Sequence, residues 1–360
     1  MKMYLNCKKI LQSAELWTFY KLKFILMKQN IKIICTIGPA TFKKEKINQL
    51  KKLNIDLFRI NLSHTKISNL KKRIKNLQNS KINNICIDTE GAQVRTTVLP
   101  KKFIKKNKIV IFNKKLKNKG NSIGLYPNFN FSKLKVKDLT SIGFESLKLK
   151  ILKIKKNALK TIVVNEGYIE SNAGVHFNRN IKLNGVTKKD VEAIAIAKKL
   201  KVNNFALSFA NNKNDVINFR KLIGQKSNLI SKIESAQAVK NLNDIIKNSD
   251  EILIDRGDLS RYVPIEKIPI VQMLILKKAN LKKKKCYVAT NLLESMVKKS
   301  QPTRAESNDI FSTLDKGADG LVLAAETAKG KYPIECVKFI IKCIKTYKHF
   351  KKHHKSIRLD

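Results

Sequence analysis

Three polar side chains in the second half of the chain have the types and the spacing that phosphoryl chemistry requires. Lys232 and Glu234 are two residues apart, so on a β-strand both side chains point to the same face. Asp258 follows the next apolar segment, and it could share one hard cation with Glu234 through oxygen ligands, as Mg²⁺ prefers. A lysine beside such a cation, opposite Arg59, would clamp a phosphoryl group during its transfer.

A second group of oxygen-bearing residues carries less negative charge and would suit a monovalent cation. Its members fall at the ends of two other apolar segments: Asn61, Ser63, Asp88 and Thr89. The backbone N–H groups where a helix starts at Gly257 and Asp258 could face an anion such as a substrate carboxylate. For any one of these polar residues, a role in capping the next helix is as good an explanation as a role in chemistry. Helix capping is a weak explanation for all of them together.

Eight short apolar segments, which alternate with helical patterns along most of the chain, would position these residues. The predicted strands are 31–37, 55–61, 84–88, 203–208, 229–234, 251–255, 286–290 and 320–324. Buried strands that alternate with helices are typical of a parallel sheet, and eight such units predict an α/β fold, a (β/α)8 TIM barrel. In such barrels the chemistry lies at the carboxyl ends of the strands, where the polar residues of this chain fall.

Four helices can be delimited from apolar spacing and capping signals. We expect a helix over 44–53 with Thr41 as its N-cap, and another over about 67–78. Thr187 and Asp190 form a capping-box-like start for a helix over 191–200. The last strand is expected to lead into a helix over 327–347.

Between residues 97 and 180 the helical period disappears and short strand-like runs replace it, at 109–112, 149–154 and 159–164, with turn residues at Gly120, Asn165 and Gly167. We predict a small all-β domain here, inserted into a barrel made of residues 27–96 and 181–348. Residues 1–26 are expected to be a disordered arm or the result of a reading start misplaced upstream of Met27. Residues 349–360 form a basic tail.

The formal charge is 75 − 27 = +48, and only nine of the 75 basic residues are Arg, which leaves 75 − 9 = 66 Lys. The Lys residues are spread over the whole length, and the Arg that reads bases or phosphates bidentately is scarce. We therefore expect nucleic acid to bind only non-specifically. Four of the nine Arg lie at strand ends or in the adjoining loops: Arg59, Arg95, Arg256 and Arg304.

Composition also excludes several classes of protein. An apolar content of 43% with 16 Phe argues against intrinsic disorder, and no run approaches the roughly 18 apolar residues of a membrane helix. None of the six Cys forms a Cys-x-x-Cys pair, which argues against a zinc ribbon or a disulfide scaffold and favours a reducing, cytoplasmic location.

Eight segments, in order, resemble the signature runs of the pyruvate kinase family. They are 35–40, 59–64, 88–91, 232–234, 256–259, 289–296, 302–306 and 326–328, and they cover roughly residues 31 to 348. The resemblance implies transfer of a phosphoryl group from phosphoenolpyruvate to ADP, giving pyruvate and ATP, the last step of glycolysis. It also implies that the inserted domain is a mobile lid that excludes water from the transfer.

The resemblance assigns roles to individual residues of this chain. Lys232, Arg59 and Thr290 would be catalytic, with Lys232 stabilising the phosphoryl group and the enolate oxygen, and Thr290 on the proton-delivery side. The implied substrate-binding set is Arg59, Ser208, Lys232, Gly257, Asp258 and Thr290. His64 and Arg95 would lie toward the nucleotide. Glu234 and Asp258 would hold Mg²⁺ or Mn²⁺, and K⁺ would bind the set Asn61, Ser63, Asp88 and Thr89. A homo-oligomer would form through barrel surfaces.

The chain departs from the family pattern at several positions. The sequence ends after the eighth barrel helix, without the family's C-terminal domain, so effector regulation is not expected. Ala324 and Ala325 replace the usual Ser-Gly, and Ala173 replaces the Lys of a Lys-Gly pair in the lid. Other departures are Thr65 for Gly, Gln93 for an acidic residue that tracks K⁺ dependence, and Asp255 for Ala. An alternative therefore stays open: a catalytically weakened barrel that binds phosphorylated metabolites or RNA through its basic surface.

Overall fold

The computed structural model describes residues 30–91, 93–114, 122–143, 147–179, 181, 183 and 185–353, the side chain of His353 excepted. The predictions for residues 1–26, for Gly120 and for the tail beyond residue 353 lie outside this part of the chain.

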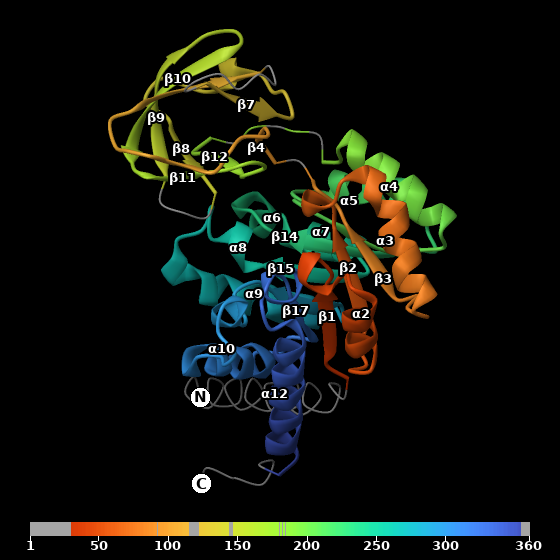
Figure 1. The fold of residues 1–360 in the computed structure, drawn as a ribbon. Helices are drawn as coiled ribbons and strands as arrows, with labels where there is room; N and C mark the ends of the chain where they lie inside the picture. The colour runs from red at the N-terminus through yellow and green to blue at the C-terminus, as the bar shows by residue number, and fades with distance from the viewer. Residues whose placement is uncertain are drawn as a thin grey trace, which may run out of the picture.

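Eight parallel strands close into a barrel with helices around it (Figure 1). The strands are β1 (Lys32–Thr36), β2 (Leu57–Asn61), β3 (Ile85–Asp88), β13 (Asn204–Leu207), β14 (Asn228–Ile233), β15 (Glu251–Asp255), β16 (Lys285–Ala289) and β17 (Gly320–Leu323). They follow one another around the barrel in chain order. Every strand lies within two residues of its predicted range, and the predicted (β/α)8 barrel is confirmed.

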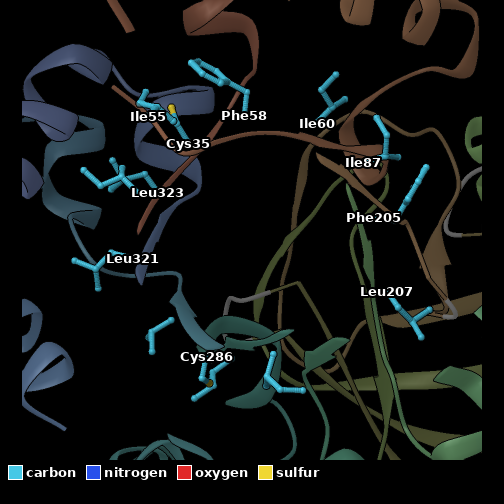
Figure 2. Packing of buried hydrophobic residues seen from close by; sticks show 14 of the residues in the cluster. Cys35, Ile55, Phe58, Ile60, Ile87, Phe205, Leu207, Cys286, Leu321 and Leu323 are labelled. Carbon is cyan, nitrogen blue, oxygen red and sulfur yellow. The ribbon is translucent and has the colours of Figure 1, made fainter. Parts of the chain in front are cut away.

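The barrel strands are buried on both faces because successive apolar side chains belong to two different cores. Ile34 and Leu253 are members of a small cluster inside the barrel. Cys35, Phe205 and Leu321 belong to a larger cluster between the strands and the helices, and Figure 2 shows them there. Since each fully buried aliphatic or aromatic side chain contributes about 1.5–3 kcal/mol, this double burial explains why the strands are apolar throughout.

The helices that cover the barrel are α2 (Lys44–Lys51), α3 (Ile67–Asn79), α4 (Lys188–Lys199), α5 (Lys213–Ile223), α6 (Ala236–Lys240), α7 (Leu242–Asn248), α8 (Arg256–Leu259), α9 (Ile268–Leu281), α10 (Arg304–Asp315), α11 (Ala325–Ala328) and α12 (Pro333–His353). The predicted capping box of α4 is confirmed, because Thr187 Oγ1 accepts a hydrogen bond from Asp190 N at 3.1 Å and the Asp190 carboxylate accepts one from Thr187 N. No helix in this part of the chain is long and apolar enough to cross a membrane.

Two helix predictions were wrong. Thr41 does not cap α2, whose N-cap is Lys43; instead the Thr41 hydroxyl accepts a hydrogen bond from Gly38 N and closes a short 3₁₀ turn. The helix expected over 327–347 is two helices, α11 and α12, which are separated at Gly330. A Cβ on Gly330 would lie 2.3 Å from Glu326 O, so the turn between the helices requires glycine. α12 also continues to His353, past the expected barrel end at residue 348.

A second sheet is formed by the chain between β3 and α4. Its order is β12-β8-β9-β10-β6-β7-β4, with β4 (Arg95–Thr96), β6 (Ile109–Asn113), β7 (Ser122–Tyr126), β8 (Leu139–Ile142), β9 (Lys148–Ile154), β10 (Ala158–Asn165) and β12 (Val175–Phe177). A separate pair joins β5 (Lys102–Ile104) to β11 (Gly167–Ile169). The three predicted strand-like runs correspond to β6, β9 and β10. Arg95 and Thr96 already pair with β7, two residues before the predicted domain start.

The second sheet has its own hydrophobic core, which includes Phe112, Phe131 and Leu149 and is separate from the cores of the barrel. In Figure 1 the sheet lies beyond one end of the barrel, next to α8. Side chains of the two parts meet there, at the carboxyl ends of the barrel strands. Whether this sheet moves as a lid stays a prediction.

Candidate active site

Lys232 is the centre of a buried polar cluster at the carboxyl ends of β2, β3, β13 and β14. Its Nζ lies 2.9 Å from Glu234 Oε1 and 3.3 Å from Asp88 Oδ1, and it donates a hydrogen bond to Ser208 Oγ at 3.1 Å. Asp88 and Glu234 are fully buried, and Lys232 and Ser208 nearly so. The parallel register brings these residues together, because Asp88 pairs with Ala206 and Lys232 lies on the neighbouring strand.

The charge of Lys232 is held by its carboxylate neighbours. Burial alone would lower the pKa of Lys232, but Asp88, Glu234 and Asp255 outweigh it and hold the pKa above its usual range. Lys232 therefore stays cationic and offers a fixed positive charge and hydrogen-bond donors, which suits the stabilisation of developing negative charge.

Arg59 comes from β2 and faces the same cluster. Its Nη1 lies 3.5 Å from Asp88 Oδ2, and the side chain is buried. Nε and Nη1 of this guanidinium have no hydrogen-bond partner among the residues that the structure describes. Buried donors without partners are costly, so this arrangement suits an anionic group that would accept from them.

Three carboxylates beside Lys232 could hold a divalent cation. Glu234, Asp255 and Asp258 each offer an oxygen, and these atoms lie within 4.8 Å of one another. Burial and the negative charges of Asp255 and Asp258 raise the pKa of Glu234, against the influence of Lys232, and a cation among the three would relieve that repulsion. The residues present therefore fit Mg²⁺ or Mn²⁺. In the sequence, Asp255 stood out only as a departure from the family pattern, in place of an alanine.

Thr290 and Gly257 meet across the ends of β16 and β15. Thr290 has a φ of +72°, an unusual conformation for a β-branched residue, and Arg256 holds its carbonyl with hydrogen bonds of 3.1 Å from Nε and 2.6 Å from Nη2. The Thr290 hydroxyl accepts from Gly257 N at 2.8 Å and donates to Ala289 O at 2.6 Å. The N–H of Gly257, expected to face an anion, thus donates to Thr290 in this structure.

The four residues expected to bind a monovalent cation are neighbours, but their oxygens are already engaged. Asn61 Oδ1 accepts from Ser63 N at 2.8 Å, and Ser63 Oγ accepts from Arg95 Nη2 at 3.1 Å. Thr89 Oγ1 donates to a backbone carbonyl at 3.1 Å, and the Asp88 carboxylate pairs with Lys232 and Arg59, as described above. A hydrogen bond occupies only one lone pair of an oxygen, so these contacts do not exclude K⁺, and K⁺ binding by this set stays a prediction.

The two residues expected toward the nucleotide lie on the barrel side of the second sheet. Arg95 Nη1 donates to Asn172 O at 3.1 Å, and Asn172 Nδ2 donates to Ser63 O at 2.6 Å, so this arginine lies between the two parts of the molecule. His64 is exposed at the end of a 3₁₀ turn that follows β2. The structure brings Arg95 to the edge of the polar cluster and leaves His64 on the surface.

Three residues beside Asp258 were missed by the sequence analysis. They are His176, Arg261 and Tyr262, which meet next to Gln93 at the contact between the second sheet and the barrel. The sequence held one signal for them: Arg261 is one of only nine arginines and follows Asp258 by three residues. His176 gave no signal, because its neighbours come from distant parts of the chain.

Comparison with known proteins gives one consistent result. A family model described as pyruvate kinase, barrel domain, matches residues 28–337. The pyruvate kinase of Thermotoga maritima is 34% identical over 344 residues, which are 92% of this chain and 74% of that protein. The pyruvate kinase of Geobacillus stearothermophilus is 31% identical over 327 residues, 87% of this chain and 56% of that protein. The pyruvate kinase of Trypanoplasma borreli is 33% identical over 321 residues, which are 86% of this chain and 64% of that protein. The chain thus spans little more than half the length of some of these relatives.

Proposed function

The chain belongs to the pyruvate kinase family, and from this premise we propose that it transfers a phosphoryl group from phosphoenolpyruvate to ADP. The bond between phosphorus and the enol oxygen breaks, and a β-phosphate oxygen of ADP forms the new bond. The enolate that leaves takes a proton on carbon and becomes pyruvate. The observation that carries the proposal is the buried cluster in which Lys232 contacts both Glu234, a carboxylate of the candidate divalent-cation site, and Asp88, which also pairs with Arg59.

Arg59 and Lys232 would bind the phosphoryl group that moves. Arg59 has buried donors to offer its oxygens, which fixes the group in line for transfer. Lys232 would stabilise both the moving group and the enolate oxygen, because its pKa lies above the usual range and it stays charged. The same high pKa argues against Lys232 as the source of the proton on carbon.

Glu234, Asp255 and Asp258 would hold Mg²⁺ or Mn²⁺, with Glu234 fixed in place by a 2.6 Å hydrogen bond from Phe209 N. When bound, the cation would draw negative charge from the phosphoryl and enolate oxygens. K⁺ would bind the set Asn61, Ser63, Asp88 and Thr89, because the single hydrogen bonds that Asn61 Oδ1 and Ser63 Oγ accept leave each oxygen a further lone pair. Assays with and without K⁺ test this directly.

The remaining contacts would orient the two substrates. Ser208 Oγ, which also touches Asp88, and the Gly257–Asp258 backbone beside Thr290 would hold phosphoenolpyruvate. Thr290 would lie on the side from which the enolate is protonated. Arg95 and His64 would contact ADP from the side of the second sheet.

We also propose a homo-oligomer formed through barrel surfaces, which light scattering would detect.

The test is a coupled assay for pyruvate from phosphoenolpyruvate, ADP and Mg²⁺. We expect activity in the unaltered chain, and a loss on the order of 10³-fold in Lys232→Met, because removing one preorganised cation from a transfer site has effects of this size. Lys221→Met on the exposed surface of α5 is the matched control and should retain full activity. Absence of pyruvate formation by the folded, unaltered chain with Mg²⁺ and K⁺ supplied would contradict the proposal. Salt-sensitive RNA binding in its place would favour the weakened-barrel alternative.

A further inference from the structure

A compact cluster of four side chains joins the second sheet to the barrel beside Asp258. Its members, which we call the latch, are Gln93, His176, Arg261 and Tyr262. His176 is contributed by β12 of the second sheet, Arg261 and Tyr262 follow α8 of the barrel, and Gln93 lies in the segment that leaves β3. His176 and Gln93 are buried, at 6% and 5% exposure.

His176 uses both ring nitrogens in the latch. Nδ1 lies 2.9 Å from Tyr262 Oη, and the two rings meet edge to face with their centroids 5.2 Å apart. Nε2 contacts Arg261 Nη1 and lies 3.2 Å from Gln93 Nε2. Since Arg261 and Gln93 can only donate here, His176 Nε2 is the acceptor and the ring is neutral.

The two donors that reach His176 also reach the carboxylate of Asp258. Gln93 Nε2 donates to Asp258 Oδ1 at 3.3 Å, and Arg261 Nε lies 3.5 Å from the same oxygen. A continuous set of contacts therefore runs from the second sheet through His176 to a carboxylate of the divalent-cation site. Groups that orient a metal-binding carboxylate in this way commonly change metal affinity by about 10–100-fold when they are removed.

The backbone of the second sheet approaches the latch closely at Gly174. A Cβ at this position would lie 2.6 Å from Arg261 Nη1 and 3.0 Å from the side-chain carboxamide of Gln93. A larger residue would displace the Arg261 guanidinium and the Gln93 carboxamide from their present positions, or shift the sheet away from them. Close seating of the sheet and the contacts to Asp258 thus depend on the same few atoms.

We propose that His176 is a positioning residue that couples the seating of the second sheet to the orientation of Asp258. When the sheet is seated, His176 holds Arg261 and Gln93 against Asp258 Oδ1, which fixes the carboxylate for a divalent cation. When the sheet departs, both donors lose their contact with His176 and no longer hold Asp258 in one orientation. The inference rests on the proposed function, because it assumes that Asp258 binds the cation.

The test measures Mn²⁺ affinity, by following the electron paramagnetic resonance signal of free Mn²⁺ during titration, without turnover. We expect His176→Ala to raise the Kd for Mn²⁺ about tenfold. In the enzyme assay it should lower kcat more than it raises KM for ADP. His176→Gln offers an acceptor and a donor on one side chain, and should recover most of the affinity. Gly174→Ala should weaken Mn²⁺ binding as His176→Ala does.

Tyr168→Ala is the matched control, because Tyr168 is a half-exposed ring on β11, which pairs with β5 in the same inserted segment and lies outside the latch. It should bind Mn²⁺ as the unaltered chain does. An unchanged Kd in folded His176→Ala and Gly174→Ala would overturn the inference, as would a failure of the unaltered chain to bind Mn²⁺. Neither result depends on catalysis, so a chain that binds Mn²⁺ but forms no pyruvate would contradict the proposed function alone.

Discussion

Thr290 illustrates how single residues in this site are held in conformations that they would not adopt unaided. A φ of +72° costs a β-branched residue about 1–3 kcal/mol, and such strain persists only where the surroundings impose it. Here the surroundings are Arg256, whose two hydrogen bonds to the Thr290 carbonyl are accompanied by an ion pair of 2.7 Å with Asp309. The strain therefore points to a functional role for the Thr290 hydroxyl.

We predict that Arg256→Lys lowers kcat by about tenfold or more, because a lysine cannot keep both hydrogen bonds to the Thr290 carbonyl and the contact with Asp309. Arg220→Lys is the matched control: Arg220 makes a comparable set of bonds, to the Ser227 carbonyl and to Asp250, away from the site. Steady-state kinetics of the two variants would check this. Equal kcat values for the two variants would show that activity does not depend on the hydrogen bonds from Arg256 to the Thr290 carbonyl.

The buried imidazole of His176 predicts that the stability of the seated form depends on pH. Burial, with the positive charges of Arg261 and Arg95, lowers the pKa of His176 to about 2 from its ordinary value of about 6.5. Because the seated form binds fewer protons than the open form, its stability is fully present above about pH 6.5 and is lost progressively as the pH falls toward 2.

We therefore expect acidification from about pH 7.5 to about pH 5.5 to lower the melting temperature of the unaltered chain more than that of His176→Gln, which has no ionisable group at this position. Thermal unfolding at both pH values gives the comparison. The flanking groups Asp258, Tyr262 and Arg95 are the same in both proteins, so they cancel. A greater loss in the glutamine variant would contradict the assigned cause.

Much of the site could be predicted from the sequence, because its residues occupy strand ends and a barrel brings strand ends together. The strand positions and the parallel register were enough to predict that Lys232, Glu234 and Asp88 lie close together. The latch could not be predicted in this way, since His176 lies 85 residues from Arg261 along the chain and reaches it through a particular seating of the second sheet. The engagement of Ser63 by Arg95 depends on the same seating.

At the scale of elements, the barrel strands were predictable because burial on both faces makes them uniformly apolar. The ends of helices were less predictable. Thr41 has the residue type of an N-cap, but its hydroxyl accepts a hydrogen bond from Gly38 N. The break between α11 and α12 depends on the close approach of Gly330 to Glu326. A glycine inside an apolar helical pattern does not by itself reveal such a contact.

The break between α11 and α12 can be tested by adding one methyl group. We predict that Gly330→Ala destabilises the protein by about 1–3 kcal/mol, because its Cβ would lie 2.3 Å from Glu326 O and the backbone must shift. Gly185→Ala is the control, since its Cβ would meet nothing closer than 3.5 Å. Chemical denaturation curves would measure both. A Gly330→Ala protein as stable as the control would show that this turn tolerates a side chain.

At the scale of the whole molecule, the charge of +48 creates a positive field around a site whose proposed substrates are both polyanions. Such a field speeds diffusional encounter and is screened by salt. We predict that kcat/KM falls several-fold as ionic strength rises from about 0.05 M to about 0.3 M, while kcat changes little. Tetramethylammonium chloride at constant K⁺ supplies the ionic strength without a competing metal. A kcat/KM that is independent of salt would show that the field does not contribute.

The separate core of the second sheet has a consequence for how this molecule could be rebuilt. Its buried residues, among them Phe112, Phe131 and Leu149, pack with one another and belong to a different cluster from the barrel core. The chain passes between the two bodies near Gln93 and again after Phe177. The insertion could therefore be exchanged as a unit: sheets from relatives could be grafted between these two crossings. The residues that face the latch, and the contacts of Arg95 and Asn172 with Ser63, would have to be matched.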